Sequence, residues 1–107
     1  MSNTDSLGEQ IQRRFPELKV VKTLNTMNAY VMVDPAQLAA GDHTVFVCGD
    51  DAEAKTKVSE LLRSFGWIDI IDVGDITTAR GTEMMLPVWV RLFGVLQKPV
   101  YNFKIVR

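Results

Sequence analysis

Short apolar segments alternate along this chain with longer segments in which apolar residues recur at helical spacing. The apolar runs are rich in β-branched residues and predict strands near residues 18–24, 43–48 and 68–73. Period-two alternation in the last segment predicts a final strand near 101–106. Because strand and helix alternate throughout, the pattern predicts an α/β sandwich built from crossover units.

The helical segments are bounded by recognisable capping residues. An apolar stripe predicts a helix over residues 51–65, with an aspartate at its N-cap and Gly66 as its stop. Ser6 and Glu9 form a capping box at the start of an earlier helix, which ends at Pro16. A long helix is expected to run from about Thr77 to Leu96, kinked at Pro87.

Composition narrows the class of protein. The 107 residues predict a single domain, 1–107, and the net charge of −1 argues against a dedicated nucleic-acid binder. Cys48 is the only cysteine and so forms no internal disulfide, which favours a reducing, cytoplasmic location. The apolar run 84–96 is shorter than the ~20 residues that span a bilayer. We therefore expect no membrane span, and a helix at 84–96 that is buried or faces another subunit.

The residue types that usually carry catalysis are sparse. His43 is the only histidine and Cys48 lies inside an apolar strand, so no triad or metal site is predicted and the catalytic residue stays unassigned. The carboxylates of "GDDAE" are interpreted as helix caps. Gly49 and Gly74 each end a strand without a G-x-G-x-x-G pattern. Gly49 is interpreted as a tight turn, whereas Gly74 is equally consistent with a turn or a ligand site.

Uncharged polar residues follow the first predicted strand. Asn25, Thr26 and Asn28 offer amide and hydroxyl groups suited to a carboxamide or ring carbonyl of a ligand. Such residues equally often satisfy the local backbone of a turn, and both interpretations stay open. If they bind a ligand, the side chains of Asn25 and Asn28 should face an open cleft, because strand ends border the ligand crevice in open α/β sheets.

Four motifs in order, "VVKTLNTMNA", "VFVCGDDAEAK", "DVGDITTARGTEM" and "FKIV", resemble the C-terminal half of the predicted dinucleotide-binding oxidoreductases related to deazaflavin-dependent NADP oxidoreductase. The reductase domain of the STEAP metalloreductases is similar. The resemblance implies a partial Rossmann-like three-layer sandwich. It also implies hydride transfer between NADP(H) and a deazaflavin or flavin-type acceptor.

The same resemblance implies roles for two groups of residues. The turn in "TLNTMNA" would lie near the nicotinamide, and the stretch after Gly74 would lie near the second cofactor. The cofactor-binding residues implied in this way are Asn25, Thr26, Asn28, Ala29, Gly74, Thr77, Thr78 and Arg80.

The family's first strand and glycine-rich turn are missing from this sequence, so the resemblance implies an incomplete, truncated enzyme. We expect its partner to be a complementing N-terminal half or a second copy in a homodimer. The alternative is a non-catalytic, self-associating α/β module. An upstream reading frame encoding G-x-G-x-x-G after a strand would favour the enzyme, and its absence would favour the module.

Overall fold

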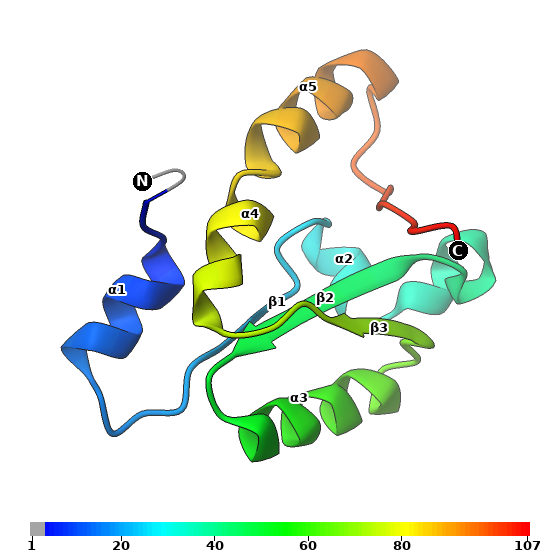
Figure 1. The fold of residues 1–107 in the computed structure, drawn as a ribbon. Coiled ribbons are helices and arrows are strands. Elements are labelled where there is room, and N and C mark those ends of the chain that lie inside the picture. Colours follow the sequence, from blue (N-terminus) through cyan, green and yellow to red (C-terminus); the bar gives the residue numbers. More distant parts are fainter. Residues whose placement is uncertain (1–3) are drawn as a thin grey trace.

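The computed structural model describes residues 4–107 as a three-stranded sheet flanked by helices (Figure 1). The α-helices are α1 (Leu7–Arg14), α2 (Ala29–Met32), α3 (Ala52–Ser64), α4 (Ala79–Glu83) and α5 (Leu86–Leu96). The strands are β1 (Val21–Thr23), β2 (Thr44–Gly49) and β3 (Asp69–Asp72). Three short 3₁₀ helices complete the regular structure: η1 (Pro35–Gln37), η2 (Ala39–Gly41) and η3 (Ile76–Thr78). The predicted α/β class is confirmed, and the three predicted strands in the first two-thirds of the chain are all formed.

The sheet has the order β1-β2-β3 and mixed strand directions. β2 and β3 are parallel and are joined through α3, as a crossover unit requires. β1 is antiparallel to β2, with Val21 opposite Gly49 and Thr23 opposite Val47. The carboxyl end of β1 therefore lies toward the amino end of β2. The sequence predicted crossover units throughout, which join parallel strands, so the antiparallel direction of β1 differs from that prediction.

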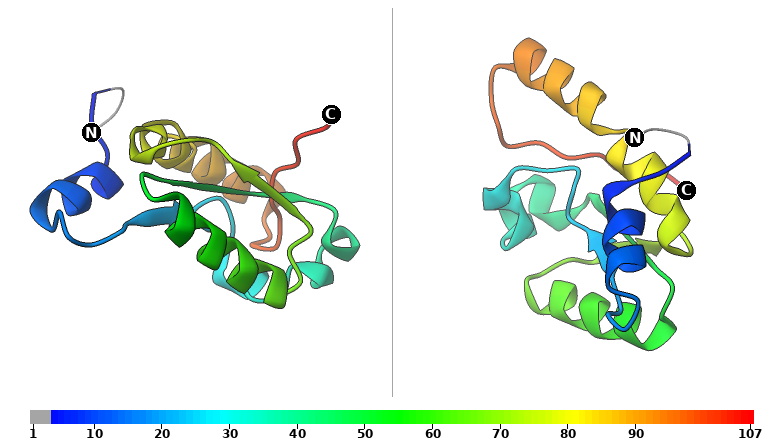
Figure 2. Two further views of the ribbon diagram at one scale, coloured as in Figure 1. Left: turned by 60° about the horizontal axis from the view of Figure 1, so that its bottom comes forward. Right: turned by 90° about the vertical axis from the view of Figure 1, so that its left-hand side faces the viewer.

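Helices cover both faces of the sheet, as the resemblance to a three-layer sandwich implies. Figure 2 shows α3 against one face and α4 on the other. Successive residues of β2 point to opposite faces. Val45 and Val47 pack in a core cluster with Leu62 of α3, whereas Cys48 packs with Ala79 at the start of α4.

Local chemistry fixes the ends of α3. The Asp51 carboxylate accepts a hydrogen bond from the Ala54 N–H at 2.8 Å, which caps the helix N-terminus. Gly66 has φ +108°, the left-handed conformation that ends a helix. A Cβ atom on Gly49 would lie 2.6 Å from the Val20 carbonyl oxygen. The helix predicted at 51–65 is thus confirmed, whereas Gly49 is the last residue of β2, paired with Val21, and its lack of a side chain allows the close approach of Val20.

Two predictions about the C-terminal third are wrong. The single helix from Thr77 to Leu96 is divided into η3, α4 and α5, because Pro87 lacks an N–H and fits the first turn of a new helix. The strand expected near 101–106 is not formed, and residues 97–107 make an irregular tail. The Ile105 N–H bonds to the Thr44 hydroxyl instead of to a backbone carbonyl, which prevents a regular ladder.

Helix α5 projects from the body of the molecule and has no buried residue along its 11 positions (Figure 1). Six apolar side chains on it are more than two-fifths exposed: Leu86, Val88, Val90, Phe93, Val95 and Leu96. This chain therefore does not bury the apolar helix that the sequence predicts to be buried or to face another subunit. No helix in residues 4–107 combines the length and hydropathy that a membrane crossing needs.

Candidate functional site

The turn after β1 begins with an unusual backbone conformation. Leu24 has φ +59°, in the left-handed region that L-residues with large side chains rarely adopt. The next residues are divided between the core and the surface: Thr26 and Met27 are buried, whereas Asn25 and Asn28 are half-buried. The turn thus inserts its centre into the core and leaves its two amides near the surface.

The hydrogen bonds of these side chains differ. The Asn25 amide donates to the Thr82 carbonyl at 2.6 Å, and within residues 4–107 its own Oδ1 has no hydrogen-bond donor. The Asn28 Oδ1 accepts from the Tyr30 N–H at 2.9 Å and so caps α2, which begins at the exposed Ala29. The Thr26 hydroxyl donates to the Asn102 Oδ1 at 2.8 Å. Of the two asparagines, Asn25 is therefore the one whose amide oxygen accepts no hydrogen bond within residues 4–107.

The second group follows β3. Gly74 has φ +113°, and its carbonyl accepts from the Gly49 N–H and from the Lys55 ammonium. The Asp75 carboxylate accepts from the Thr77 N–H and hydroxyl, and the Thr78 hydroxyl donates to the Asp75 carbonyl at 2.6 Å. These bonds hold η3 in place, directly before α4.

Arg80 binds a carboxylate on α1. Its guanidinium donates to the Glu9 carboxylate through Nε at 2.8 Å and through Nη2 at 2.7 Å. These hydrogen bonds hold the pKa of Glu9 below its ordinary value, and they raise the pKa of Arg80. Glu83, one turn further on, accepts from the first N–H groups of α1, those of Leu7 and Gly8. Helix α4 is therefore attached to α1 at both of its ends.

Two surface hollows border α4. One, of about 280 Å³, is lined by Leu7, Lys22, Asn25, Glu83 and Leu86. The other, of about 360 Å³, is mostly apolar and is lined by Phe46, Val73, Thr78, Gly81, Thr82 and Met85. Each hollow contains one residue of a predicted group, Asn25 in the first and Thr78 in the second. We define these two hollows together with α4 as the α4 site.

The two predicted groups of cofactor-binding residues begin at different ends of β2. The Gly74 carbonyl contacts Gly49, the last residue of β2, whereas Thr26 binds Asn102, whose amide donates to the carbonyl of Thr44, the first residue of β2. The groups therefore start at opposite ends of β2, and α4 connects them, since Asn25 bonds to Thr82 of this helix and Thr78 is its N-cap. Glu9 and Glu83 were not identified from sequence as neighbours of this site, because their partners are more than 70 residues away in the chain.

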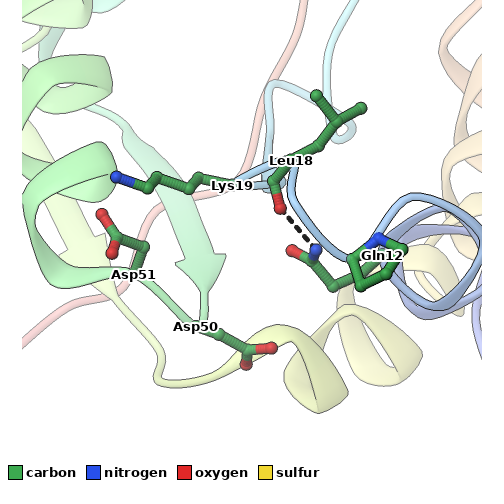
Figure 3. A pocket seen from close by; sticks show the side chains of 6 residues that line it. Gln12, Leu18, Lys19, Asp50 and Asp51 are labelled. Atoms are coloured by element: carbon green, nitrogen blue, oxygen red, sulfur yellow. Dashed lines mark hydrogen bonds between the residues drawn. The ribbon is translucent and has the colours of Figure 1, made fainter.

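A third hollow, of about 310 Å³, lies at the carboxyl end of β2 (Figure 3). Lys19 extends there toward Asp51, and Asp50 points away toward η3, where its carboxylate accepts from the Ile76 N–H at 3.0 Å (Figure 3). Both aspartates thus cap helices, as interpreted from sequence. None of the predicted cofactor-binding residues lines this hollow, and we assign it no ligand.

The remaining chemically active side chains are in the interior. His43 is 3% exposed and packs edge-on against Trp67. Its Nε2 lies 2.9 Å from the Pro35 carbonyl, which can only accept, so Nε2 carries the proton and Nδ1 accepts from Asn102. Burial raises the pKa of the Cys48 thiol. Over residues 4–107, no cluster of three His, Cys, Asp or Glu side chains has the spacing of a metal site.

Comparison with known proteins gives related sequences for nearly the whole chain. No family model matches it. A 1.70 Å crystal structure described as "a putative f420 dependent nadp-reductase" from Arthrobacter sp. FB24 is 68% identical over 99% of this chain, with a TM-score of 0.97. Metalloreductase STEAP3 of Rattus norvegicus is 33% identical over 83% of this chain, and metalloreductase STEAP2 of Homo sapiens is 33% identical over 90%.

The match covers only part of each relative. The chain spans 48% of the Arthrobacter protein and 18% of each metalloreductase. Within that length the identity is high enough to compare individual residues, and the four sequence motifs lie inside the matched region of the Arthrobacter protein. The resemblance predicted from those motifs is confirmed: this chain resembles part of the deazaflavin-dependent NADP oxidoreductases and, at lower identity, the STEAP metalloreductases.

Proposed function

We propose that this chain is part of an NADP-dependent oxidoreductase that transfers hydride between NADP(H) and a deazaflavin or flavin-type acceptor. The observation that carries the proposal is the 68% identity, at a TM-score of 0.97, to the Arthrobacter protein described as "a putative f420 dependent nadp-reductase". When bound, the two cofactors supply the redox chemistry. The protein side chains then have to bind the rings, orient them and exclude water.

The hollow beside Asn25 suits the nicotinamide side. The unoccupied Asn25 Oδ1 can accept a hydrogen bond from a carboxamide N–H, while its amide stays fixed to Thr82. Thr26 and Asn28 hold the turn, and Ala29 presents only a methyl group at the exposed start of α2. We therefore propose that Asn25 contacts the ring substituent and that Thr26, Asn28 and Ala29 shape the surface around it.

The apolar hollow beside Thr78 suits the second cofactor. Phe46, Val73 and Met85 provide a hydrophobic wall for a planar ring, and Thr78 provides a hydroxyl at its edge. Gly74 and Thr77 fix the turn that leads into this wall. Arg80 places a positive charge on α4, oriented by Glu9.

The proposal includes a partner, since the chain has no glycine-rich dinucleotide turn. β1 and β3 each have one strand neighbour within residues 4–107, so each edge of the sheet is open to a further strand. We propose a complementing N-terminal half, encoded separately or upstream, that adds to this sheet. We also propose a cytoplasmic location, because the single cysteine is free and buried.

Self-association is the second element of the proposal. The accessible surface is 6546 Å² for a chain of 12.0 kDa, whereas a compact monomer of this mass exposes about 6,000 Å². The excess coincides with an α5 that buries none of its residues. A homodimer across α5 would cover it. The same observation supports the alternative function, a non-catalytic α/β module that exists only as an oligomer.

Binding and turnover experiments test the proposal. NADPH fluorescence is titrated with the 107-residue chain alone and with the chain plus an N-terminal half taken from a relative. We expect weak binding alone, tight binding with the added half, and NADPH oxidation when a deazaflavin or flavin is supplied. A reconstituted complex that binds NADPH and reduces neither acceptor would refute the hydride-transfer function and leave the non-catalytic module.

A further inference from the structure

We propose that Asn102, in the C-terminal tail, is a positioning residue for the nicotinamide-side turn, residues 24–28, which it holds through Thr26. The inference rests on the proposed function for its role in hydride transfer, but the structural part can be tested without it. Asn102 lies 76 residues from Thr26 in the chain, and none of the sequence patterns connects the two.

The amide of Asn102 forms three hydrogen bonds, and their directions are determined. Its Nδ2 donates to the Thr44 carbonyl at 2.9 Å and to the His43 Nδ1 at 2.8 Å. Its Oδ1 accepts from the Thr26 hydroxyl at 2.8 Å. The Thr44 carbonyl can only accept, so the amide cannot be turned over without losing that bond. The side chain of Asn102 therefore has one orientation, and in it the oxygen faces Thr26.

The groups around Asn102 form one continuous network. Thr26 donates to Asn102, Asn102 donates to His43, and His43 donates through Nε2 to the Pro35 carbonyl. Thr26, His43 and Thr44 are each at most 3% exposed. Because these three residues are shielded from water and Asn102 is half-buried, removing the Thr26 hydroxyl takes away the one donor recorded for the Asn102 Oδ1 within residues 4–107. We name this network of Thr26, Asn102, His43 and the Pro35 carbonyl the tail network.

The turn held by this network needs external support. A leucine in the left-handed conformation, as at Leu24, is intrinsically unfavourable and persists where surrounding contacts fix it. Two hydrogen bonds just after Leu24 fix the turn: the bond from Asn25 to Thr82 and the bond from Thr26 to Asn102. The peptide that carries the Asn25 side chain is thus held between α4 and the tail. A shift at Thr26 would move the Asn25 Oδ1 that the proposed function uses.

The tail is bonded to other elements on both sides of Asn102, to α5 before it and to β2 after it. The Tyr101 hydroxyl donates to the Trp89 carbonyl at 2.6 Å, and the two rings stack with centroids 5.0 Å apart. The Phe103 carbonyl accepts from the Thr44 N–H at 2.9 Å. Asn102 lies between these two anchors. Its position is therefore set independently of the turn that it holds.

The first test is ¹H–¹⁵N NMR on the 107-residue chain with two test variants and two matched controls. Thr26→Val and Asn102→Leu keep side-chain size and remove the bond between them. Thr23→Val removes a comparable threonine bond, to the Phe46 carbonyl, and Lys104→Met removes the tail's ion pair with Asp42. We expect the resonances of the Asn25 side-chain amide, which reports its bond to Thr82, to shift in the test variants only. Equal shifts in the controls, or none in Thr26→Val, would overturn the proposal.

The second test is hydride transfer by the reconstituted complex. We expect Thr26→Val to lower the hydride-transfer rate constant roughly two- to tenfold, with a smaller change in the NADPH dissociation constant. Thr26→Ser, which keeps the hydroxyl, should restore it, and Thr23→Val should match wild type. An active wild type with unchanged rates in Thr26→Val overturns the positioning role. A wild type without hydride transfer refutes the proposed function instead, and the NMR result then decides the structural part alone.

If Asn102→Leu fails to fold, a double-mutant cycle can use Asn102→Ser with Thr26→Val. Since the two residues share one bond, the double variant should shift the turn resonances no further than the larger of the two single changes. Additive shifts would show that Asn102 and Thr26 act independently, and the proposal would be wrong.

Discussion

Replacing Asn25 by alanine should affect both stability and hydride transfer, and the structure separates the two effects. The variant removes the hydrogen bond of 2.6 Å between the Asn25 amide and the Thr82 carbonyl, which is half-shielded from water. A neutral bond of this kind contributes about 0.5–1.5 kcal/mol net. For a domain of this size, 1 kcal/mol lowers the melting temperature by about 4–8 °C. We expect Asn25→Ala to lower the free energy of unfolding and the melting temperature by amounts in these ranges.

The effect on hydride transfer comes from the other atom of the amide. If the Asn25 Oδ1 accepts from the nicotinamide carboxamide, its removal costs a further 0.5–1.5 kcal/mol, or about two- to tenfold in rate or affinity. Asn25→Asp is the matched variant, because it keeps an acceptor oxygen and loses the donor to Thr82. It should lose at least as much stability as Asn25→Ala and retain more hydride transfer.

Calorimetry and stopped-flow measurement of NADPH oxidation by the reconstituted complex would check both effects. Asn25→Ala with a wild-type melting temperature would show that the bond to Thr82 contributes nothing. A destabilised Asn25→Ala with wild-type kinetics at a temperature where it is folded would make Asn25 a structural turn residue. Either result would refute one half of the reasoning and leave the other intact.

Three further predictions concern the rest of the chain. Hydrogen bonds from Arg107, then from Thr44, hold the pKa of Asp69 below its ordinary value of 3.8. Arg107→Met should therefore reduce the free energy of unfolding at neutral pH. The difference in this free energy between the variant and wild type should disappear as the pH falls below about 4 and passes through the lowered pKa of Asp69. Urea titrations at each pH would measure it. Val95, 79% exposed on α5, should be at a subunit interface, so Val95→Asp should convert a sedimenting dimer to monomer; a wild-type monomer would contradict this. Gly49→Ala should prevent folding or lower the free energy of unfolding by several kcal/mol, because its Cβ would meet the Val20 carbonyl. Gly81→Ala has open space around the new methyl group and should raise the free energy of unfolding by about 0.5–1 kcal/mol in thermal melts.

Sequence reasoning succeeded where the determining interactions are local. The stripe of α3, its Asp51 cap and Gly66 all lie within one segment, and the structure has each of them. The predicted cap at Ser6 is also present, with the Glu9 N–H donating to the Ser6 hydroxyl at 3.2 Å, while the Glu9 carboxylate accepts from that hydroxyl and from Arg80. These features depend on spacings of three or four residues, which a pattern along the chain records directly.

Features set by distant residues were missed. The final segment has the alternation of a strand, yet its backbone is held by side chains such as Thr44 and by its own Tyr101 and Asn102. The apolar residues of α5 left two outcomes open, a helix buried in this chain or one that faces another subunit, and the structure, in which α5 has no buried residue, removes the first. Both outcomes depend on which elements are present to pack, and a pattern along one segment does not contain that information.

The antiparallel direction of β1 also changes how the candidate site is arranged. In a fully parallel sheet, the Asn25 turn and the Gly74 turn would meet at one edge, and a ligand crevice there would contact both. Here they start at opposite ends of β2, and α4 connects them by carrying Thr78 at its N-cap and Thr82 within its last turn. Direct hydride transfer needs the reacting atoms of the two rings about 3–3.5 Å apart, so in the proposed function a nicotinamide beside Asn25 and a second ring beside Thr78 would have to meet along α4 and not be separated by it. Small shifts of α4 would then change the distance between the rings, and the bonds that fix this helix, Arg80 to Glu9 and Glu83 to α1, would set part of the geometry that the proposed hydride transfer needs.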